Sequence, residues 1–140
     1  MRNTPHQIVE VKSPKDKPDS VIVIRYFRFW DDVYHQISSS GGMSVICKLD
    51  YKKNRMFVYP SFCSEKDNFN KAEGLYHAIN AHNNDFGFAL DFDKGMSIFE
   101  NIYFSVLHGN INYNDIESNT KLHAPLTRWV NGNHEANYAW

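Results

Sequence analysis

Two alternating apolar runs, joined by a short polar segment, constrain the fold of this chain more than any other feature. Between residues 44 and 62, apolar and polar side chains alternate on either side of residues 52–55. A period of two puts one set of side chains on each face of a strand, and two such runs joined by a short turn form an antiparallel hairpin. The segment therefore predicts a β-hairpin with one face against the core.

A turn symmetric about Lys53 and Asn54 sets the predicted register of this hairpin. Leu49 then faces Val58, and every pair on the inner face is apolar, as strand pairing against a core requires. The other predicted pairs are Val45 with Phe62, Cys47 with Pro60, and Tyr51 with Met56.

Pro60 and the two cysteines add constraints to this hairpin. Because proline cannot donate a hydrogen bond to a neighbouring strand, Pro60 predicts that the second strand lies at an edge of the sheet. In the predicted register Cys63 points away from Cys47, which opposes a disulfide between them. Two cysteines without the spacing of a zinc site or a redox pair predict free thiols.

The chain before the hairpin predicts two strands and a short helix. Residues 7–12 alternate weakly and residues 21–29 are β-branched and aromatic, so both segments are predicted strands, joined as a hairpin by the loop 13–20. Apolar residues at a helical spacing begin at Trp30, with two aspartates near the helix start, and a break follows at residues 38–42. The residues of this predicted helix are Trp30, Asp31, Asp32, Val33, Tyr34 and Ile37.

The chain after the hairpin predicts a helix, a strand, a second helix and a polar tail. Ser64 or Asp67 caps the first helix, which ends near residues 82–84. Residues 86–92 predict a strand, and residues 99–107 predict a helix closed by Gly109. In the tail 110–140, Pro125 opens a helical turn, and the order of the tail depends on what its Trp residues contact. The apolar stripe of the first helix is Phe69, Ala72, Leu75, Tyr76 and Ile79.

Together these elements predict one α+β domain over residues 1–140, with an antiparallel sheet of four to five strands and two main helices packed on one face. The chain has 140 residues, 42% of them hydrophobic and 15% aromatic, enough to bury a core without disulfides or metals. The net charge of -1 excludes a global positive field that would recruit nucleic acid or an anionic membrane.

The sequence also predicts where the protein works. The N-terminal residues lack the apolar centre of a signal peptide, and no apolar run approaches the roughly 20 residues that a membrane span needs. We therefore expect a cytoplasmic protein without membrane contact.

A basic, aromatic cluster at the predicted hairpin is the first candidate site. Cations can hold phosphates while aromatic rings stack on bases, so the cluster predicts a surface for nucleic acid or for a protein. The alternative is a solvated turn, since Asp50 dilutes the charge and lysines are common at hairpin tips. The cluster consists of Lys48, Tyr51, Lys52, Lys53, Arg55, Phe57 and Tyr59.

Two pairs of side chains are candidate metal ligands. Asp91 and Asp93 share a face of a predicted strand and can bind Mg²⁺ or Mn²⁺, although such a pair more often ends a strand and caps a helix. Glu73 and His77 lie four residues apart on the first predicted helix, a spacing that can chelate one ion. Neither pair has a third ligand at a recognisable spacing, so we expect no cofactor.

Aromatic side chains of the predicted sheet form a third candidate site. An exposed aromatic patch would anchor a protein interface, whereas burial under the helices would make the same residues core. The alternation leaves both open. The residues are Tyr26, Trp30, Phe57 and Tyr59.

Residues 44–83 resemble small uncharacterised accessory proteins of tailed bacteriophages. The residues that carry the resemblance are the strand end Lys48–Tyr51, the helix start at residues 63–69, Lys71 and Gly74. The resemblance implies a small protein that binds and inhibits a host protein, as anti-CRISPR proteins do, and it transfers no site.

From these observations we expect a non-enzymatic inhibitor or adaptor whose partner is a bacterial host protein or protein–nucleic-acid complex, with a homodimer open. Two alternatives remain: a nucleic-acid-binding module that uses the hairpin 48–59, and a small divalent-metal-dependent hydrolase that uses Asp91 and Asp93.

Overall fold

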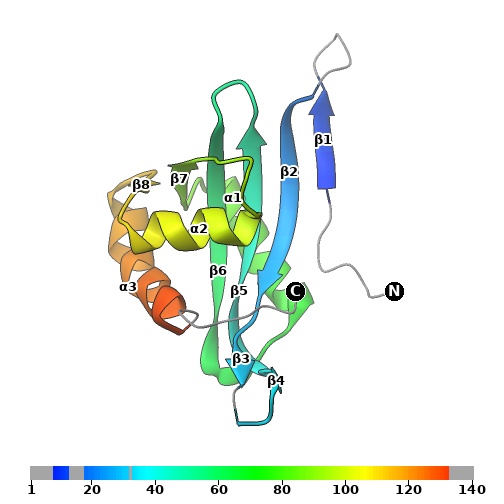
Figure 1. Cartoon of the computed structure of the whole chain (residues 1–140), viewed down its shortest axis with the longest axis vertical. Coiled ribbons are helices and arrows are strands. Elements are labelled where there is room, and N and C mark those ends of the chain that lie inside the picture. The colour runs from blue at the N-terminus through cyan, green and yellow to red at the C-terminus, as the bar shows by residue number, and fades with distance from the viewer. Residues whose placement is uncertain (1–7, 13–17, 32, 133–140) are drawn as a thin grey trace.

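The structure is a computed structural model that describes residues 8–12, 18–31 and 33–132. The predicted hairpin lies at the centre of its sheet. Strands β5 (Ser40–Asp50) and β6 (Arg55–Asn68) pair antiparallel in the middle of a sheet that has six strands in these described residues (Figure 1). The strand order is β1-β2-β5-β6-β7-β8, with antiparallel neighbours throughout. The remaining bounds are Ile8–Lys12 for β1, Pro18–Phe27 for β2, Phe88–Asp91 for β7 and Asn112–Tyr113 for β8.

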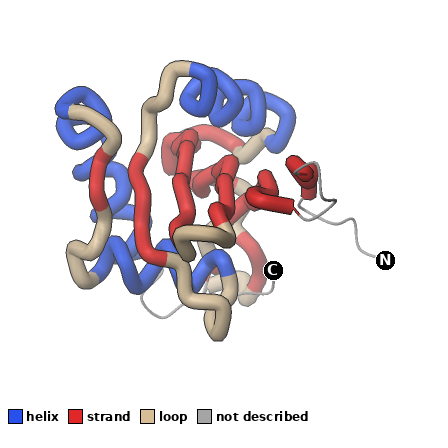
Figure 2. Tube along the Cα trace, turned by 90° about the horizontal axis from the view of Figure 1, so that it is seen from above, coloured by secondary structure: helices blue, strands red, loops and turns tan. Residues whose placement is uncertain are grey.

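Helices cover both faces of the sheet (Figure 2). Helix α1 (Lys71–Asn83) lies on one face, and α2 (Ile98–Leu107) and α3 (Ile116–Gly132) lie on the other. The α+β class with an antiparallel sheet is confirmed; in the described residues the main sheet has six strands against the four to five predicted, and three helices lie on its two faces rather than two on one. Helices lie on both faces because β5 is buried on both of them and needs a covering layer on each.

The larger core lies between the sheet and helices α2 and α3. Trp129 of α3 is its largest fully buried side chain, and its ring centroid lies 5.9 Å from that of Phe27 and 5.4 Å from that of Phe99. Leu122 and Leu126 of α3 are buried in the same core as Trp129. The tail predicted at residues 110–140 is therefore an integral helix through Gly132, and Pro125 lies inside it rather than at its start. Residues 133–140 lie outside the described residues.

The smaller core lies under α1, and the apolar stripe predicted for this helix is wrong. The buried helix residues are Ala78 and Ala81, whereas Tyr76 and Ile79 are exposed. A Cβ at Gly74 would overlap with Ser44 Oγ on the sheet, so the helix backbone approaches β5 more closely than large side chains allow. Small residues therefore face the sheet together with half-buried Leu75, whereas Tyr76 and Ile79 face solvent.

The start of α1 also differs from the prediction. β6 continues to Asn68, so Ser64 and Asp67 belong to the strand and cannot cap a helix. Asn70 is the N-cap, and its side chain accepts a hydrogen bond from the Glu73 amide at 2.9 Å. The predicted end of the helix near residues 82–84 is confirmed.

The predicted register of the β5–β6 hairpin is wrong by two residues. Leu49 faces Met56, and Val45 faces Pro60. The turn is one residue earlier than predicted, because Asp50 Oδ1 accepts hydrogen bonds from the amides of residues 52 and 53, and Asn54 adopts a φ of 50°. A shift of two keeps every side chain on its predicted face, so the predicted inner face is still the buried one.

The placement of β6 at the edge of the sheet is also wrong for the strand as a whole. β7 pairs with β6, but only from Arg55 to Val58. Pro60 lies beyond this pairing, where its missing N–H costs no hydrogen bond to β7.

The helix predicted between Trp30 and Ile37 is a small hairpin. It consists of β3 (Trp30–Asp31) and β4 (Gln36–Ile37), paired antiparallel. The side chain of Asp31 accepts hydrogen bonds from the amides of Val33 and Tyr34, a local turn that competes with a helix. The helical spacing of the aromatic residues was therefore misleading.

The remaining predicted elements are confirmed, with bounds that differ from the prediction by up to three residues. β1 and β2 form the predicted hairpin, although β2 begins at Pro18, inside the predicted loop, and residues 7 and 13–17 lie outside the described residues. The predicted strand 86–92 is β7, and the predicted helix 99–107 is α2. Gly109 follows α2 with a φ of 72°, as a helix-closing glycine does.

Candidate protein interface

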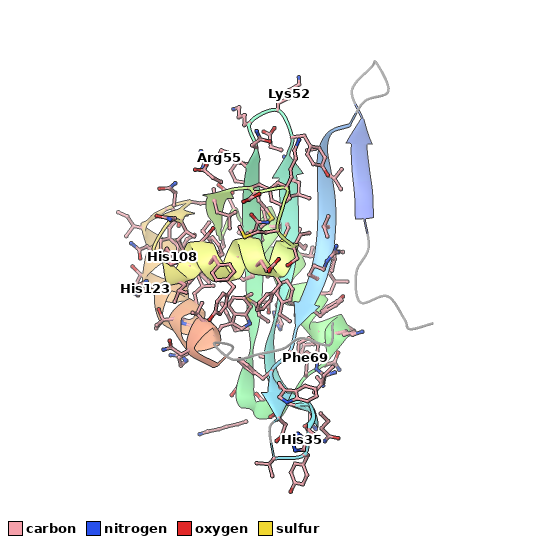
Figure 3. The ribbon with its side chains drawn as sticks, in the orientation of Figure 1. His35, Lys52, Arg55, Phe69, His108 and His123 are labelled. Carbon is pink, nitrogen blue, oxygen red and sulfur yellow. The ribbon has the colours of Figure 1, made fainter. Side chains whose placement is uncertain are left out.

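The β3–β4 hairpin presents large apolar side chains to solvent at one end of the molecule. Val33 is 79% exposed and Tyr34 is 72% exposed, and Trp30 at the base of the hairpin is 36% exposed. Figure 3 shows His35 of the same turn at the end of the molecule opposite Lys52. Tyrosine and tryptophan are enriched among the residues that dominate protein binding, so exposed Tyr34 and Trp30 on a protruding hairpin are candidate contacts.

Local hydrogen bonds hold the shape of this tip. Asp31 Oδ1 accepts from the Val33 amide at 2.9 Å and from the Tyr34 amide at 3.2 Å. The next residue, His35, has a φ of 51°, which reverses the chain. At the base, the Ser38 amide donates to the Phe29 carbonyl at 2.8 Å. These bonds fix the turn without help from the tip side chains.

Arg28 connects the base of the hairpin to the body of the protein. Its Nη2 donates to the Ser38 carbonyl at 2.9 Å, and its guanidinium lies 5.0 Å from the ring centroid of Phe69. The Phe69 ring meets Tyr26 edge-on at 6.1 Å, and the Lys71 ammonium lies 5.4 Å from the Tyr26 ring. The side chains next to the base of the hairpin are therefore cationic and aromatic.

The basic cluster predicted at the β5–β6 turn lies at the other end of the sheet. Lys52 and Lys53 are exposed on the turn, Tyr51 is 39% exposed, and Lys48 is half-buried. Figure 3 shows Lys52 at the tip and Arg55 below it.

The two predicted aromatic members of the cluster on β6 belong to the core under α1. Tyr59 is 7% exposed and its ring meets His82 at 4.9 Å, while Phe57 packs against the same core. Burial, and then the neighbouring charge and hydrogen bond of Asp85, raise the pKa of Tyr59 to about 12. Neither ring is free to stack on a base, so Tyr51 alone keeps that possibility at this end.

The aromatic patch predicted on the sheet is divided in the same way. Phe57 and Tyr59 lie under α1, Tyr26 packs against Phe69, and Trp30 is exposed on the β3–β4 hairpin. The four side chains therefore do not form one surface.

The predicted carboxylate pair ends a strand and shapes a turn. Asp91 is the last residue of β7 and is exposed. Asp93 Oδ1 accepts from the Gly95 amide at 2.8 Å, and the backbone of Asp93 binds the side chain of Asn101. These contacts are those of a turn leading into α2, so the pair ends the strand as the structural alternative expected, but Ser97 rather than either aspartate caps the helix.

The second predicted metal pair, Glu73 and His77, is exposed on α1. Over residues 8–12, 18–31 and 33–132, no three His, Cys, Asp or Glu side chains lie close enough to hold one metal ion.

Both cysteines are free thiols, as predicted. Burial raises the pKa of the Cys47 thiol to about 12, against a smaller opposing effect of Arg25, so this thiol is a poor nucleophile. Cys63 is half-buried on β6.

Sequence reasoning missed the β3–β4 tip as a site because it assigned those residues to a helix with its apolar side inward. The signal that could have found it is the pair of aspartates followed by Val33 and Tyr34, since Asp at the start of a turn accepts hydrogen bonds from the next backbone amides. Large apolar residues in such a turn have no core to enter.

Comparisons with protein-family models, curated proteins and solved structures give no match to this chain. Among the described helices, none combines the length and the apolar character required to cross a bilayer.

Proposed function

We propose that this protein is a small non-enzymatic inhibitor or adaptor that binds another protein through the tip of its β3–β4 hairpin. The observation that carries the proposal is the exposure of Val33 and Tyr34 on a turn held by its own hydrogen bonds.

Burial of these two side chains supplies the binding energy. A fully buried aliphatic or aromatic side chain contributes about 1.5 to 3 kcal/mol relative to exposure, and Tyr is among the residues most often found at binding hot spots. The hydrogen bonds from the Val33 and Tyr34 amides to Asp31 restrain the backbone of the turn, which reduces the conformational entropy lost on binding. Asp31 therefore supports affinity without needing to contact the partner.

The partner class follows from the resemblance of residues 44–83 to phage accessory proteins. We propose a bacterial host protein, alone or with nucleic acid, in the host cytoplasm. The cationic base formed by Arg28 and Lys71 favours a partner with an acidic rim around its pocket.

Capture from bacterial lysate by the immobilised full-length protein, with mass spectrometry, tests this function. We expect a protein that wild type retains and Val33→Ser/Tyr34→Ser loses. Asp31→Ala keeps both apolar side chains but loosens the turn, and we expect an affinity about fivefold weaker than wild type, within the cost of ordering a loop.

Two matched variants complete this test. Tyr76→Ser/Ile116→Ser removes the same kind of exposed apolar surface from α1 and α3, and should retain the partner. Lys52→Glu/Lys53→Glu reverses charge at the opposite end, and should also retain it. If no protein depends on Val33 and Tyr34, or if the lysine variant alone loses binding, the proposed function is wrong.

A further inference from the structure

Beyond Val58, strand β6 has a neighbour on one side only. It pairs with β5 as far as Asn68, whereas its pairing with β7 stops at Val58 opposite Phe88. In the described residues, no strand continues the sheet along β6 after that point. A strand edge of this kind is a template for a further strand.

The backbone groups that face this edge can be identified from the neighbouring strand. The Val58 carbonyl points toward β7, because a Cβ on Gly87 would overlap with its oxygen. Backbone groups of alternate residues in a strand point to the same side, so the carbonyl of Pro60 and both the N–H and the carbonyl of Phe62 face the free edge. In the part of the chain that the structure describes, none of these three groups has a hydrogen bond.

A groove follows this edge, and we call it the edge groove. Pro60, Ser61 and Phe62 form its floor, and its volume is about 710 Å³. One wall comes from α1, with Ala81, and the other from α3, with Leu122. The two helices lie on opposite faces of the sheet (Figure 2), so they border the edge groove on both sides of the strand.

A second hollow, of about 550 Å³, adjoins the edge groove at Phe62 and carries positive charge. Its lining includes Trp129, Lys66 and Arg128, and no carboxylate is among the side chains that the structure places around it. Neither Lys66 nor Arg128 has an ion pair within the described residues. We call it the basic hollow.

Among the lining residues that the structure describes, the edge groove has one carboxylate, and it is already paired. Glu117 lies 3.2 Å from Lys121 in an exposed i, i+4 ion pair, so it does not neutralise the basic hollow. The charge along the edge therefore favours an anionic ligand at the end near Lys66 and Arg128.

We infer that the free edge of β6 binds an extended acidic peptide segment of a partner protein by strand addition. The peptide backbone bonds to Pro60 and Phe62, an apolar side chain packs on the Phe62 ring, and a carboxylate reaches Lys66 and Arg128. Main-chain bonds give affinity and the flanking hollow gives selectivity, as in other cases of β-augmentation. This site is separate from the β3–β4 tip and does not depend on it.

The probe is a short synthetic peptide of alternating Val and Asp, titrated into the isotope-labelled full-length protein and followed by NMR. We expect saturable shifts at residues 60–64 and about tenfold or more slower amide exchange at Phe62, because its N–H gains a partner. A peptide with the same sequence but N-methylated along one edge should not bind.

Charge variants give the second part of the test. Lys66→Glu/Arg128→Glu should bind the Val–Asp peptide about fivefold or more weakly, consistent with two partly exposed charge contacts. The matched control Lys53→Glu/Lys94→Glu should bind as wild type does. A Val–Lys peptide should bind less tightly than Val–Asp to the wild-type protein.

Several results would overturn the inference. They are the absence of saturable binding by the Val–Asp peptide, equal binding of the Val–Lys or N-methylated peptide, and shifts that map away from residues 60–64. Concentration-dependent dimerisation that protects Phe62 without peptide would assign the edge to a second copy of the chain instead. The β3–β4 variants should leave peptide binding unchanged, so this test is independent of the proposed function.

Discussion

Ser44 and Gly74 lie where α1 approaches the sheet closely. Ser44 is buried and its Oγ has no hydrogen-bond partner in the described residues. A buried hydroxyl without a partner costs free energy, so Ser44→Ala should be neutral or stabilising by up to about 1 kcal/mol. Urea unfolding measures the change in the free energy of unfolding.

The same contact predicts coupling between the two positions. Gly74→Ala places a methyl group against Ser44 Oγ and should destabilise the protein by about 1 to 3 kcal/mol. In a Ser44→Ala background the loss should be smaller, because the overlapping oxygen is gone. An equal loss in both backgrounds would mean that the helix does not approach the sheet this closely.

Tyr59 predicts a loss of stability at high pH. Its ordinary pKa of 10.0 is raised to about 12 in the fold, so its contribution is complete below pH 10 and is lost as pH rises to 12. Tyr59→Phe removes this ionisation and should recover up to about 2 kcal/mol of the alkaline loss. The measurement compares urea unfolding of wild type and variant at pH 9 and pH 11.5. Parallel losses in the two proteins would show that Tyr59 ionises freely in the fold.

At the scale of elements, the β5–β6 turn depends on Asn54 in a left-handed conformation. Asn54→Ala should cost about 1 kcal/mol, because alanine pays for a positive φ, whereas Asn54→Gly should be nearly neutral. Thermal unfolding of the two variants beside wild type checks this order. Equal loss in both variants would contradict the assigned turn.

The sequence predicted the faces of the hairpin strands better than their register. Alternation alone assigns Val45, Cys47 and Leu49 to one buried face, and this holds for any shift of two residues. The register depends on the turn, where the Asp50 side chain binds two amides and moves the turn by one residue. The periodicity of apolar residues does not predict where the turn lies.

Helical spacing failed at the β3–β4 hairpin and at α1 for different reasons. At the hairpin, the Asp31 side chain offers the backbone hydrogen bonds that a helix would otherwise supply. At α1 the helix exists, but close packing against Ser44 selects Gly74 and Ala78 for the inner face. Size rather than hydrophobicity decided which side is buried.

The candidate sites could be predicted only in part. Exposure of Lys52 and Lys53 follows from their place in a turn. Burial of Tyr59 depends on α1, and the free edge at Phe62 depends on where β7 stops. Both depend on tertiary packing, which the alternation of apolar residues within one strand does not predict.

At the scale of the whole molecule, α3 completes the main core. Trp129 contacts rings from β2 and α2, so Trp129→Ala should destabilise the protein by about 3 to 5 kcal/mol. Thr127→Ala on the exposed side of the same helix is the control and should change stability by less than about 0.5 kcal/mol. Urea unfolding measures both. A small loss for Trp129→Ala would mean that α3 is not part of the core.

The β3–β4 turn and the β5–β6 turn lie at opposite ends of the molecule. The β5–β6 turn with Lys52 lies at one end and the β3–β4 turn with His35 lies at the other (Figure 3). A partner bound at the tip therefore leaves the basic turn exposed, and the two can be tested separately.

The most direct test is a calorimetric titration of the purified partner into wild-type protein, Val33→Ser/Tyr34→Ser and Tyr76→Ser/Ile116→Ser. We expect the tip variant to bind at least about thirtyfold more weakly, which corresponds to about 2 kcal/mol for two buried hot-spot side chains. The control should differ from wild type by less than about threefold, because exposed residues outside an interface contribute little. Equal affinities of wild type and the tip variant would contradict the assignment of the β3–β4 hairpin as the binding site.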